Sequence, residues 1–221
     1  MRLLAIGDIH GCFVALDALW KIVLPSESET VVFLGDYVDR GPESRQVLDW
    51  LVRESTKSNR VFLRGNHEVM MLEAAENPFG ADSWKECGGL ETLLSYGVLR
   101  GSDWPSKIPE AHWSFLRSTG RYYETARHIF VHACLDPQLG LDEQMNDMLY
   151  WETFDQLRPH RSGKKVVCGH TTLGDSKIAD VGYGVCIETG VAYGGWLTCL
   201  DALSGQFWQT NQDGHSRSGK L

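Results

Sequence analysis

Three short apolar segments, each followed directly by a glycine-containing polar segment, constrain the fold most strongly. Residues 3–6, 31–34 and 61–63 are rich in Val, Leu and Ile, as buried β-strands are. Between them, residues 12–24 and 47–52 repeat apolar side chains at steps of three and four, as amphipathic helices do. The pattern predicts a β-α-β-α-β unit whose strands are parallel and buried.

The rest of the chain changes from helices to short strands. Apolar periodicity predicts helices at residues 69–75, 90–94 and 109–116. Strands are predicted after them, at residues 122–125, 128–131, 165–168, 178–181, 185–188, 196–200 and 206–209. We therefore expect an α/β (α+β) fold with a single domain over residues 1–210. Residues 211–221 are polar with almost no apolar anchor, so we expect a flexible tail there.

Charge and cysteine content exclude several classes of partner. The chain has 221 residues and a formal net charge of -8, whereas nucleic acids and anionic membranes attract clustered Lys and Arg. We expect neither as a partner. The six cysteines contain no C-x-x-C pair, which is typical of reduced thiols in the cytoplasm. The N-terminal apolar run is too short for a signal peptide or a membrane helix, so we expect a cytoplasmic protein.

The polar segments after the first three strands contain the candidate functional residues. They read GDIHG at residues 7–11, GDYVDRG at 35–41 and RGNHE at 64–68. Because ligands of open α/β sheets bind beyond the carboxyl ends of the strands, we expect these segments to meet in space. Two later apolar strands also end in a histidine, at His132 and His170.

The side chains of these segments suit a metal ion of hard or borderline character. Asp8, Asp36 and Asn66 supply oxygen and His10 supplies an imidazole nitrogen, with no thiolate among them. This mixture suits Mn, Fe or Zn. The three oxygen donors could instead cap the helices that follow their strands, as Asp and Asn often do. Their recurrence after several strands favours a metal site.

These motifs, together with the later VH and GH, resemble the signature of the calcineurin-like metallophosphoesterases. The resemblance covers residues 1–210 and is strongest to the phosphoprotein phosphatase branch, in particular its bacterial and phage serine/threonine phosphatases. It implies a four-layer αββα β-sandwich with a dinuclear metal centre at the sheet edge. It also implies two divalent metal ions as cofactors, with Mn favoured in vitro and Fe or Zn as alternatives.

The metal ligands implied by the resemblance all follow predicted strands: Asp8 and His10 for one ion, Asn66, His132 and His170 for the other, and Asp36 as the bridge. Physical chemistry agrees with such a bridge. Two cations about 3.5–4 Å apart need an anion between them, and together they lower the pKa of a shared water.

The resemblance also implies roles for four residues that hold no metal. His67 would protonate the leaving group and Asp39 would orient His67. Arg40 and Arg64 would hold the phosphoryl oxygens, a task that suits the planar guanidinium better than an ammonium.

The chain departs from the resemblance after Trp151. Relatives carry an arginine two or three residues later, whereas this sequence reads WETFDQLRPH. Arg158 and Arg161 are candidates to replace that arginine. The departure leaves the implied metal ligands intact and leaves the substrate open.

The activity implied by the resemblance is phosphomonoester hydrolysis by a protein serine/threonine phosphatase, in which a metal-bridging hydroxide attacks phosphorus. The substrates would be phosphorylated proteins or peptides, or small phosphoesters. The alternative is symmetrical hydrolysis of dinucleoside polyphosphates such as diadenosine tetraphosphate, because enzymes with that activity share the three motifs. A binding module that has lost catalysis is disfavoured, because the implied ligands and His67 are all present.

Overall fold

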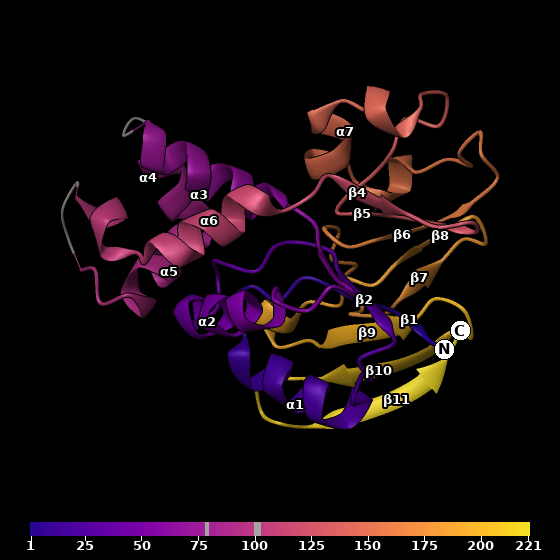
Figure 1. Ribbon diagram of the computed structural model, residues 1–221, viewed down its shortest axis with the longest axis horizontal. Coiled ribbons are helices and arrows are strands. Elements are labelled where there is room, and N and C mark those ends of the chain that lie inside the picture. Colours follow the sequence, from indigo (N-terminus) through magenta and orange to yellow (C-terminus); the bar gives the residue numbers. More distant parts are fainter. Residues whose placement is uncertain (78–79, 100–102) are drawn as a thin grey trace.

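The computed structural model describes residues 1–77, 80–99 and 103–221, and the strands within these ranges form two sheets (Figure 1). The first sheet has six strands in the order β11-β10-β9-β1-β2-β3, and the second has five in the order β4-β5-β6-β8-β7. The strands are β1 (Leu3–Ile6), β2 (Thr30–Phe33), β3 (Arg60–Phe62), β4 (Tyr122–Glu124), β5 (His128–Val131), β6 (Lys165–Cys168), β7 (Ala179–Asp180), β8 (Gly184–Cys186), β9 (Leu197–Asp201), β10 (Gln206–Thr210) and β11 (Ser216–Lys220).

The first three strands form the predicted β-α-β-α-β unit. β1 pairs with β2 and β2 pairs with β3, both in parallel. The two crossover helices are α1 (Phe13–Val23) and α2 (Ser44–Glu54). α1 buries Leu16 and Leu19, and α2 buries Leu48 and Leu51, because these side chains share one face of each helix.

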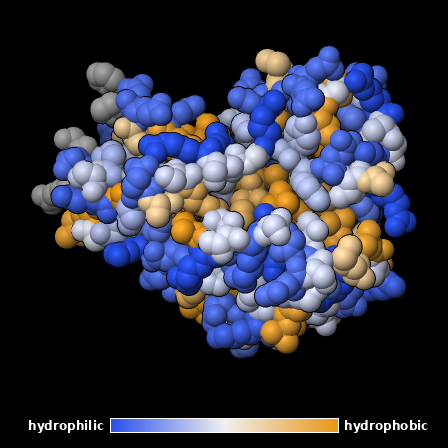
Figure 2. Space-filling model, in the orientation of Figure 1, coloured by the Kyte–Doolittle hydropathy of each residue, from blue (hydrophilic) through white to orange (hydrophobic). Residues whose placement is uncertain are grey.

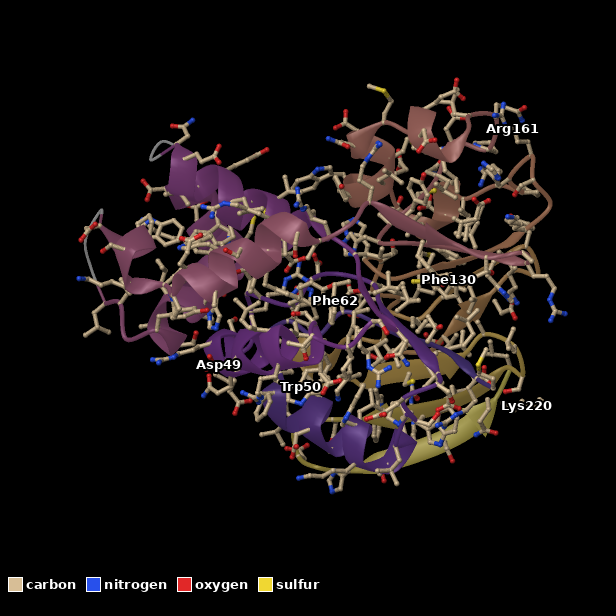
Figure 3. The ribbon with its side chains drawn as sticks, in the orientation of Figure 1. Asp49, Trp50, Phe62, Phe130, Arg161 and Lys220 are labelled. Atoms are coloured by element: carbon tan, nitrogen blue, oxygen red, sulfur yellow. The ribbon has the colours of Figure 1, made fainter. Side chains whose placement is uncertain are left out.

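Alternation of side chains along the strands builds three apolar layers. On β1, Leu4 and Ile6 pack with the helices, whereas Leu3 and Ala5 pack into the space between the two sheets. Phe130 of β5 enters the same inner layer from the second sheet (Figure 3). The outer face of the second sheet is covered by α7 (Asn146–Trp151) and neighbouring loops. The expected four-layer αββα arrangement is confirmed.

Helices α3 to α6 form a lobe beside the sandwich (Figure 1). Their bounds are α3 (Asn66–Glu76), α4 (Ala81–Trp84), α5 (Leu90–Ser95) and α6 (Glu110–Ser118). A cluster of tryptophans holds the lobe together: the rings of Trp84 and Trp104 lie 4.8 Å apart and those of Trp104 and Trp113 lie 5.9 Å apart. Figure 2 shows apolar residues in the depression between this lobe and the sandwich.

The C-terminal residues differ from the expected flexible tail. β11 pairs antiparallel with β10 over all five of its residues, so the backbone of residues 216–220 is held in the first sheet. Arg217 adds a side-chain contact, because its guanidinium lies 4.3 Å from the ring centroid of Trp196. Backbone pairing needs no apolar side chains, so the apolar periodicity used to predict strands did not detect β11.

Two expectations from the composition concern the state of the cysteines and the presence of membrane-spanning helices. All six cysteines are free thiols, and five of them are buried. Among the helices that the structure describes, none combines the length and the apolar character needed to cross a membrane.

Candidate metal centre

The polar segments that follow β1, β2, β3, β5 and β6 meet at one edge of the two sheets. The carboxyl ends of these strands point to the same side, because the strands are parallel within each sheet. The residues that come together there are Asp8, His10, Asp36, Asn66, His67, His132 and His170.

The Asp36 carboxylate lies between two groups of potential ligands. Its Oδ2 is 3.4 Å from Nε2 of His10 and 3.9 Å from Nε2 of His67. Its Oδ1 is 3.5 Å from Nε2 of His132. The ligand atoms of Asp36, His132 and His170 lie within 4.8 Å of one another, as do those of His10, Asp36 and His67. One carboxylate therefore faces both groups, as a bridging ligand must.

Backbone carbonyls orient two of the imidazoles. Nδ1 of His10 donates to the carbonyl of Val38 at 3.0 Å, and Nδ1 of His132 donates to the carbonyl of Leu34 at 3.0 Å. With the proton on Nδ1, Nε2 of each ring presents its lone pair toward Asp36. Fixing the tautomer in this way prepares a histidine to bind a metal ion.

One buried carboxylate oxygen of the centre has no hydrogen-bond partner, and imidazole lone pairs face the same space. Oδ1 of Asp8 is buried without a hydrogen-bond partner. The side-chain amide of Asn66 lies 3.1 Å from Nε2 of His132 and 3.2 Å from Nδ1 of His170; its nitrogen can donate to these two atoms, and the opposite amide orientation presents its oxygen to the same space. Lone pairs that converge in a buried space are what a cation satisfies.

The charges of the centre also fit divalent cations. Burial, followed by the charges of Glu188 and Asp36, raises the pKa of Asp8 well above its usual value. Burial raises the pKa of Glu188 and of Glu68 to about 7 in each case. Burial also acts to raise the pKa of Asp36, but the imidazoles, led by that of His132, outweigh it and hold this pKa below its usual value. Bound cations would offset this excess of buried carboxyl groups.

Backbone strain is concentrated at the same residues. His10, Asp36 and His170 adopt positive φ angles of 45°, 51° and 64°, which side chains other than glycine adopt rarely. Asp39 and Arg40 do so as well, with φ of 72° and 70°. Such strain typically costs about 1–3 kcal/mol per residue and clusters at functional sites.

Two glycines allow the loops to approach closely. A Cβ atom on Gly65 would lie 2.1 Å from Oδ1 of Asp36, and one on Gly169 would lie 2.1 Å from Oδ1 of Asp8. Any side chain at either position would displace a carboxylate of the centre.

Glu68 is a residue of the centre whose function the sequence analysis missed. Its buried carboxylate accepts hydrogen bonds from the backbone N–H groups of Asp36, Tyr37 and Gly65, at 2.8, 2.8 and 2.9 Å. It therefore fixes the segment that carries Asp36. The signal was available, because Glu68 occupies the third position of α3, where a glutamate commonly accepts from the residue before the helix.

His67 is held by Asp39 at the side of the centre. Nδ1 of His67 lies 2.8 Å from Oδ2 of Asp39, which also accepts from Nε1 of Trp84 at 2.8 Å. The hydroxyl of Thr92 donates to the other Asp39 oxygen at 2.7 Å. Burial lowers the pKa of His67, but the charges of Asp36 and Asp39 and the hydrogen bond to Asp39 outweigh it and raise this pKa overall.

The structure separates the two arginines of the motifs. Nη1 of Arg40 lies 2.6 Å from Nε2 of His10, and its guanidinium packs 5.4 Å from the ring centroid of Tyr193. Arg64 instead donates to the hydroxyl of Thr119 at 3.0 Å and to backbone carbonyls at the end of α6. Arg40 is therefore at the centre, whereas the side chain of Arg64 is bound to α6.

Neither candidate for the missing arginine reaches the centre. Arg158 donates to the carbonyls of Asp155 and Leu157 in its own loop. Arg161 donates to the carbonyl of Gln138 and lies at the periphery of the molecule (Figure 3). The centre therefore gains no guanidinium from this loop in the structure.

An open pocket of about 450 Å³ adjoins the centre. Its lining includes Arg40, Asn66 and His67 of the centre. Trp151 and Tyr193 also line it, and their side chains are 43% and 65% exposed. The pocket therefore presents two partly exposed aromatic surfaces beside the buried centre.

Comparison with known proteins agrees with the fold and the donor set. Residues 1–190 match the family model of the calcineurin-like phosphoesterases. The chain therefore belongs to this family, and the resemblance seen in the sequence is confirmed. Calcineurin-like phosphoesterases use divalent metal ions, which the converging oxygen and nitrogen donors fit.

Two relatives and one solved structure illustrate the similarity. A symmetrical bis(5'-nucleosyl)-tetraphosphatase of Coxiella burnetii is 30% identical over 141 residues, which are 63% of this chain and 44% of the relative. The chain thus matches less than half the length of that relative. The asymmetrical bis(5'-nucleosyl)-tetraphosphatase PrpE of Anoxybacillus flavithermus is 24% identical over 88% of both chains. A crystal structure provisionally assigned as a diadenosine tetraphosphatase shares the fold, with a TM-score of 0.69, 22% identity and coverage of 99% of this chain and 93% of the other.

Proposed function

We propose that this chain is a metal-dependent hydrolase of dinucleoside polyphosphates, which cleaves diadenosine tetraphosphate symmetrically into two nucleoside diphosphates. The observation that carries the proposal is the pair of exposed aromatic side chains, Trp151 and Tyr193, beside the converging ligands. Nucleobases stack on such surfaces, at about 1–3 kcal/mol per base. The relatives named as nucleosyl-tetraphosphatases support this substrate over the phosphoprotein that the motifs alone favoured.

In this proposal the buried centre holds two divalent ions, with Mn as the favoured metal and Fe or Zn as alternatives. Asp8 and His10 would hold one ion, and Asp36 would contact both; Asn66, His132 and His170 would hold the other. The bound ions would lower the pKa of a shared water enough to supply hydroxide at neutral pH. The chain's part is to fix these donors through the hydrogen bonds of His10, His132 and Glu68.

Arg40 and His67 act on the substrate in this proposal. The Arg40 guanidinium points into the centre and would hold a phosphoryl oxygen. His67 would donate a proton from Nε2 to the leaving oxygen, while Asp39 holds Nδ1. Arg64 as a further phosphate ligand stays a prediction, because its side chain would have to leave Thr119 first.

A protein serine/threonine phosphatase is the second candidate, and the His67–Asp39 pair favours it. A serine or threonine alkoxide is a poor leaving group and needs a proton donor, whereas a nucleoside diphosphate leaves readily. The pair is buried and its Asp39 is fixed by Trp84 and Thr92. The cytoplasmic location expected from cysteine usage stays a prediction for either candidate.

A direct substrate comparison separates the two candidates. With Mn-reconstituted enzyme, we expect kcat/KM for diadenosine tetraphosphate to exceed that for a phosphoserine peptide at least about 100-fold, because both bases can stack beside the centre. Chromatography of the products should give ADP alone. A preference for the phosphopeptide would overturn the proposal, and AMP plus ATP would replace the symmetrical reaction by the asymmetrical one.

Removing an aromatic surface should weaken nucleotide binding. Tyr193→Ala should raise KM for diadenosine tetraphosphate about tenfold, since one stacked base contributes about 1–3 kcal/mol. Tyr193→Phe keeps the ring and should restore the original KM. The KM for a small alkyl phosphate, which has no base, should not change in either variant. An equal loss on both substrates in Tyr193→Ala would mean that Tyr193 acts through Arg40 instead.

The pH profile should report the contact between Asp39 and His67. Asp39 raises the pKa of His67, so Asp39→Asn should lower this pKa. A smaller fraction of His67 should then carry a proton at neutral to alkaline pH. The alkaline limb of kcat should therefore move to lower pH in the variant. An unchanged limb would show that His67 does not titrate in catalysis.

A further inference from the structure

Residues 170–172, which follow β6, contact the segment that carries Trp151, one of the two aromatic residues of the pocket. Nε2 of His170 lies 3.2 Å from the backbone carbonyl of Trp151. A carbonyl oxygen only accepts, so Nε2 carries the proton and donates it in this bond. The hydroxyl of Thr171 accepts from the backbone N–H of Phe154 at 2.9 Å. These two bonds hold the Trp151 segment against the segment that carries His170.

The carboxylate of Glu188 makes the corresponding link to the segment that carries Tyr193. Its Oε1 accepts from the hydroxyl of Thr172 at 3.1 Å and from the backbone N–H of Gly190 at 2.8 Å. Glu188 is buried, so these bonds lie in surroundings where hydrogen bonds are stronger than in water. One carboxylate oxygen therefore joins the segment after His170 to the turn that leads to Tyr193.

Gly190 holds both ends of that turn. Its carbonyl accepts from the backbone N–H of Tyr193 at 2.9 Å and from that of Gly195 at 2.8 Å. The side chain of Tyr193 is mostly exposed, so the backbone of the turn determines its position more than packing does. A shift of Gly190 would therefore move the aromatic surface of Tyr193 relative to the pocket.

We propose that Glu188 and Thr172 are positioning residues, which fix the ring of Tyr193 relative to the metal centre and so determine how tightly a nucleobase binds. The inference rests on the proposed function, in which a base stacks on Tyr193. The bonds from Thr172 through Glu188 to Gly190 link the ligand-bearing segment of His170 to the aromatic surface. Both positioning residues act through Tyr193 and not on the reacting atoms.

Steady-state kinetics of the Mn-loaded enzyme test this role. Thr172→Val removes the hydroxyl that binds Glu188 and keeps the shape of the side chain. KM for diadenosine tetraphosphate should rise about fivefold with kcat unchanged, because binding of the base is weakened and the reacting atoms are not disturbed. KM for a small alkyl phosphate should stay the same. Thr172→Ser keeps the hydroxyl and should restore KM for the nucleotide.

A matched control is available outside the pocket. Thr56 is exposed just beyond α2, where its hydroxyl donates to the carbonyl of Arg53. Thr56→Val makes the same chemical change as Thr172→Val and should alter neither KM nor kcat. An effect confined to Thr172→Val would then belong to the link with Glu188.

Amide hydrogen exchange follows the turn without any substrate. It is measured by NMR on the zinc-loaded enzyme, because zinc is diamagnetic. The N–H of Gly190 donates to Glu188, so its exchange rate reports how well this bond is kept. In Thr172→Val the amides of Gly190 and Tyr193 should exchange at least about tenfold faster, and Thr172→Ser should restore the slower exchange. The amides of β1 should exchange at unchanged rates, which would show that the sheet is intact.

The two measurements separate a failure of this inference from a failure of the proposed function. Unchanged exchange at Gly190 in Thr172→Val would overturn the positioning role, whatever the substrate is. An equal rise of KM for the nucleotide and for the alkyl phosphate would overturn it as well, because the effect would not depend on the base. Faster exchange in an enzyme that does not hydrolyse diadenosine tetraphosphate would support the positioning of Tyr193 and overturn only the proposed substrate.

Discussion

Replacing His67 by Asn is expected to lower kcat for an alkyl phosphate, whose leaving group needs a proton, about 100- to 10,000-fold while two metal ions stay bound. This is the usual contribution of a positioned proton donor. The geometry also allows His67 to be a metal ligand. Its Nε2 lies 3.9 Å from Oδ2 of Asp36, and the ligand atoms of His10, Asp36 and His67 all lie within 4.8 Å of one another. We favour the proton donor because the 2.8 Å hydrogen bond to Asp39 prepares His67 to carry a proton.

The measurement is metal content by elemental analysis alongside kcat on two substrates. The loss should be smaller for a substrate whose leaving group needs no proton, such as an aryl phosphate with an acidic phenol. His215→Asn changes an exposed histidine outside the centre and should alter neither quantity. Loss of bound metal in His67→Asn would make His67 a ligand instead.

Replacing Asp36 by Asn is expected to remove both metal ions and, with them, nearly all activity. Asp36 faces His10 through Oδ2 and His132 through Oδ1, so it is the carboxylate that both groups of ligands share. An amide would leave two cations without their anionic bridge. We expect metal affinity to fall at least about 100-fold, as measured by competition with a chelator. Asp17→Asn on the surface of α1 is the matched control.

Retention of both ions by Asp36→Asn would contradict the bridging assignment. Retention of one ion would limit the role of Asp36 to a single site. The glycine at position 65 offers a second approach: Gly65→Ala would press a methyl group against Oδ1 of Asp36, and metal affinity should fall in that variant too.

The convergence of the centre was predictable because it follows from strand direction. Apolar runs identified β1, β2 and β3, and parallel strands bring the residues after them to one edge. The positions of Asp8, Asp36 and Asn66 follow from this rule without knowledge of any side-chain conformation. The same reasoning extended to His132 and His170 once β5 and β6 were recognised as strands.

Side-chain direction was not predictable, because distant parts of the chain decide it. Arg64 follows a strand of the same unit, yet the carbonyl groups at the end of α6 and the hydroxyl of Thr119 bind its guanidinium. For Glu68, the helix-start position indicated the hydrogen bond to Gly65, but the bonds to the backbone N–H groups of Asp36 and Tyr37 depend on a segment about thirty residues away and could not be predicted. The pairing of β11 with β10 was missed because backbone pairing leaves no apolar pattern.

A crystal structure of the Mn-loaded enzyme, with anomalous scattering recorded at the manganese edge, tests the central claim most directly. The account predicts two anomalous peaks on either side of the Asp36 carboxylate, one contacted by Asp8 and His10 and the other by Asn66, His132 and His170. A single peak, or peaks that Asp36 does not touch, would contradict it.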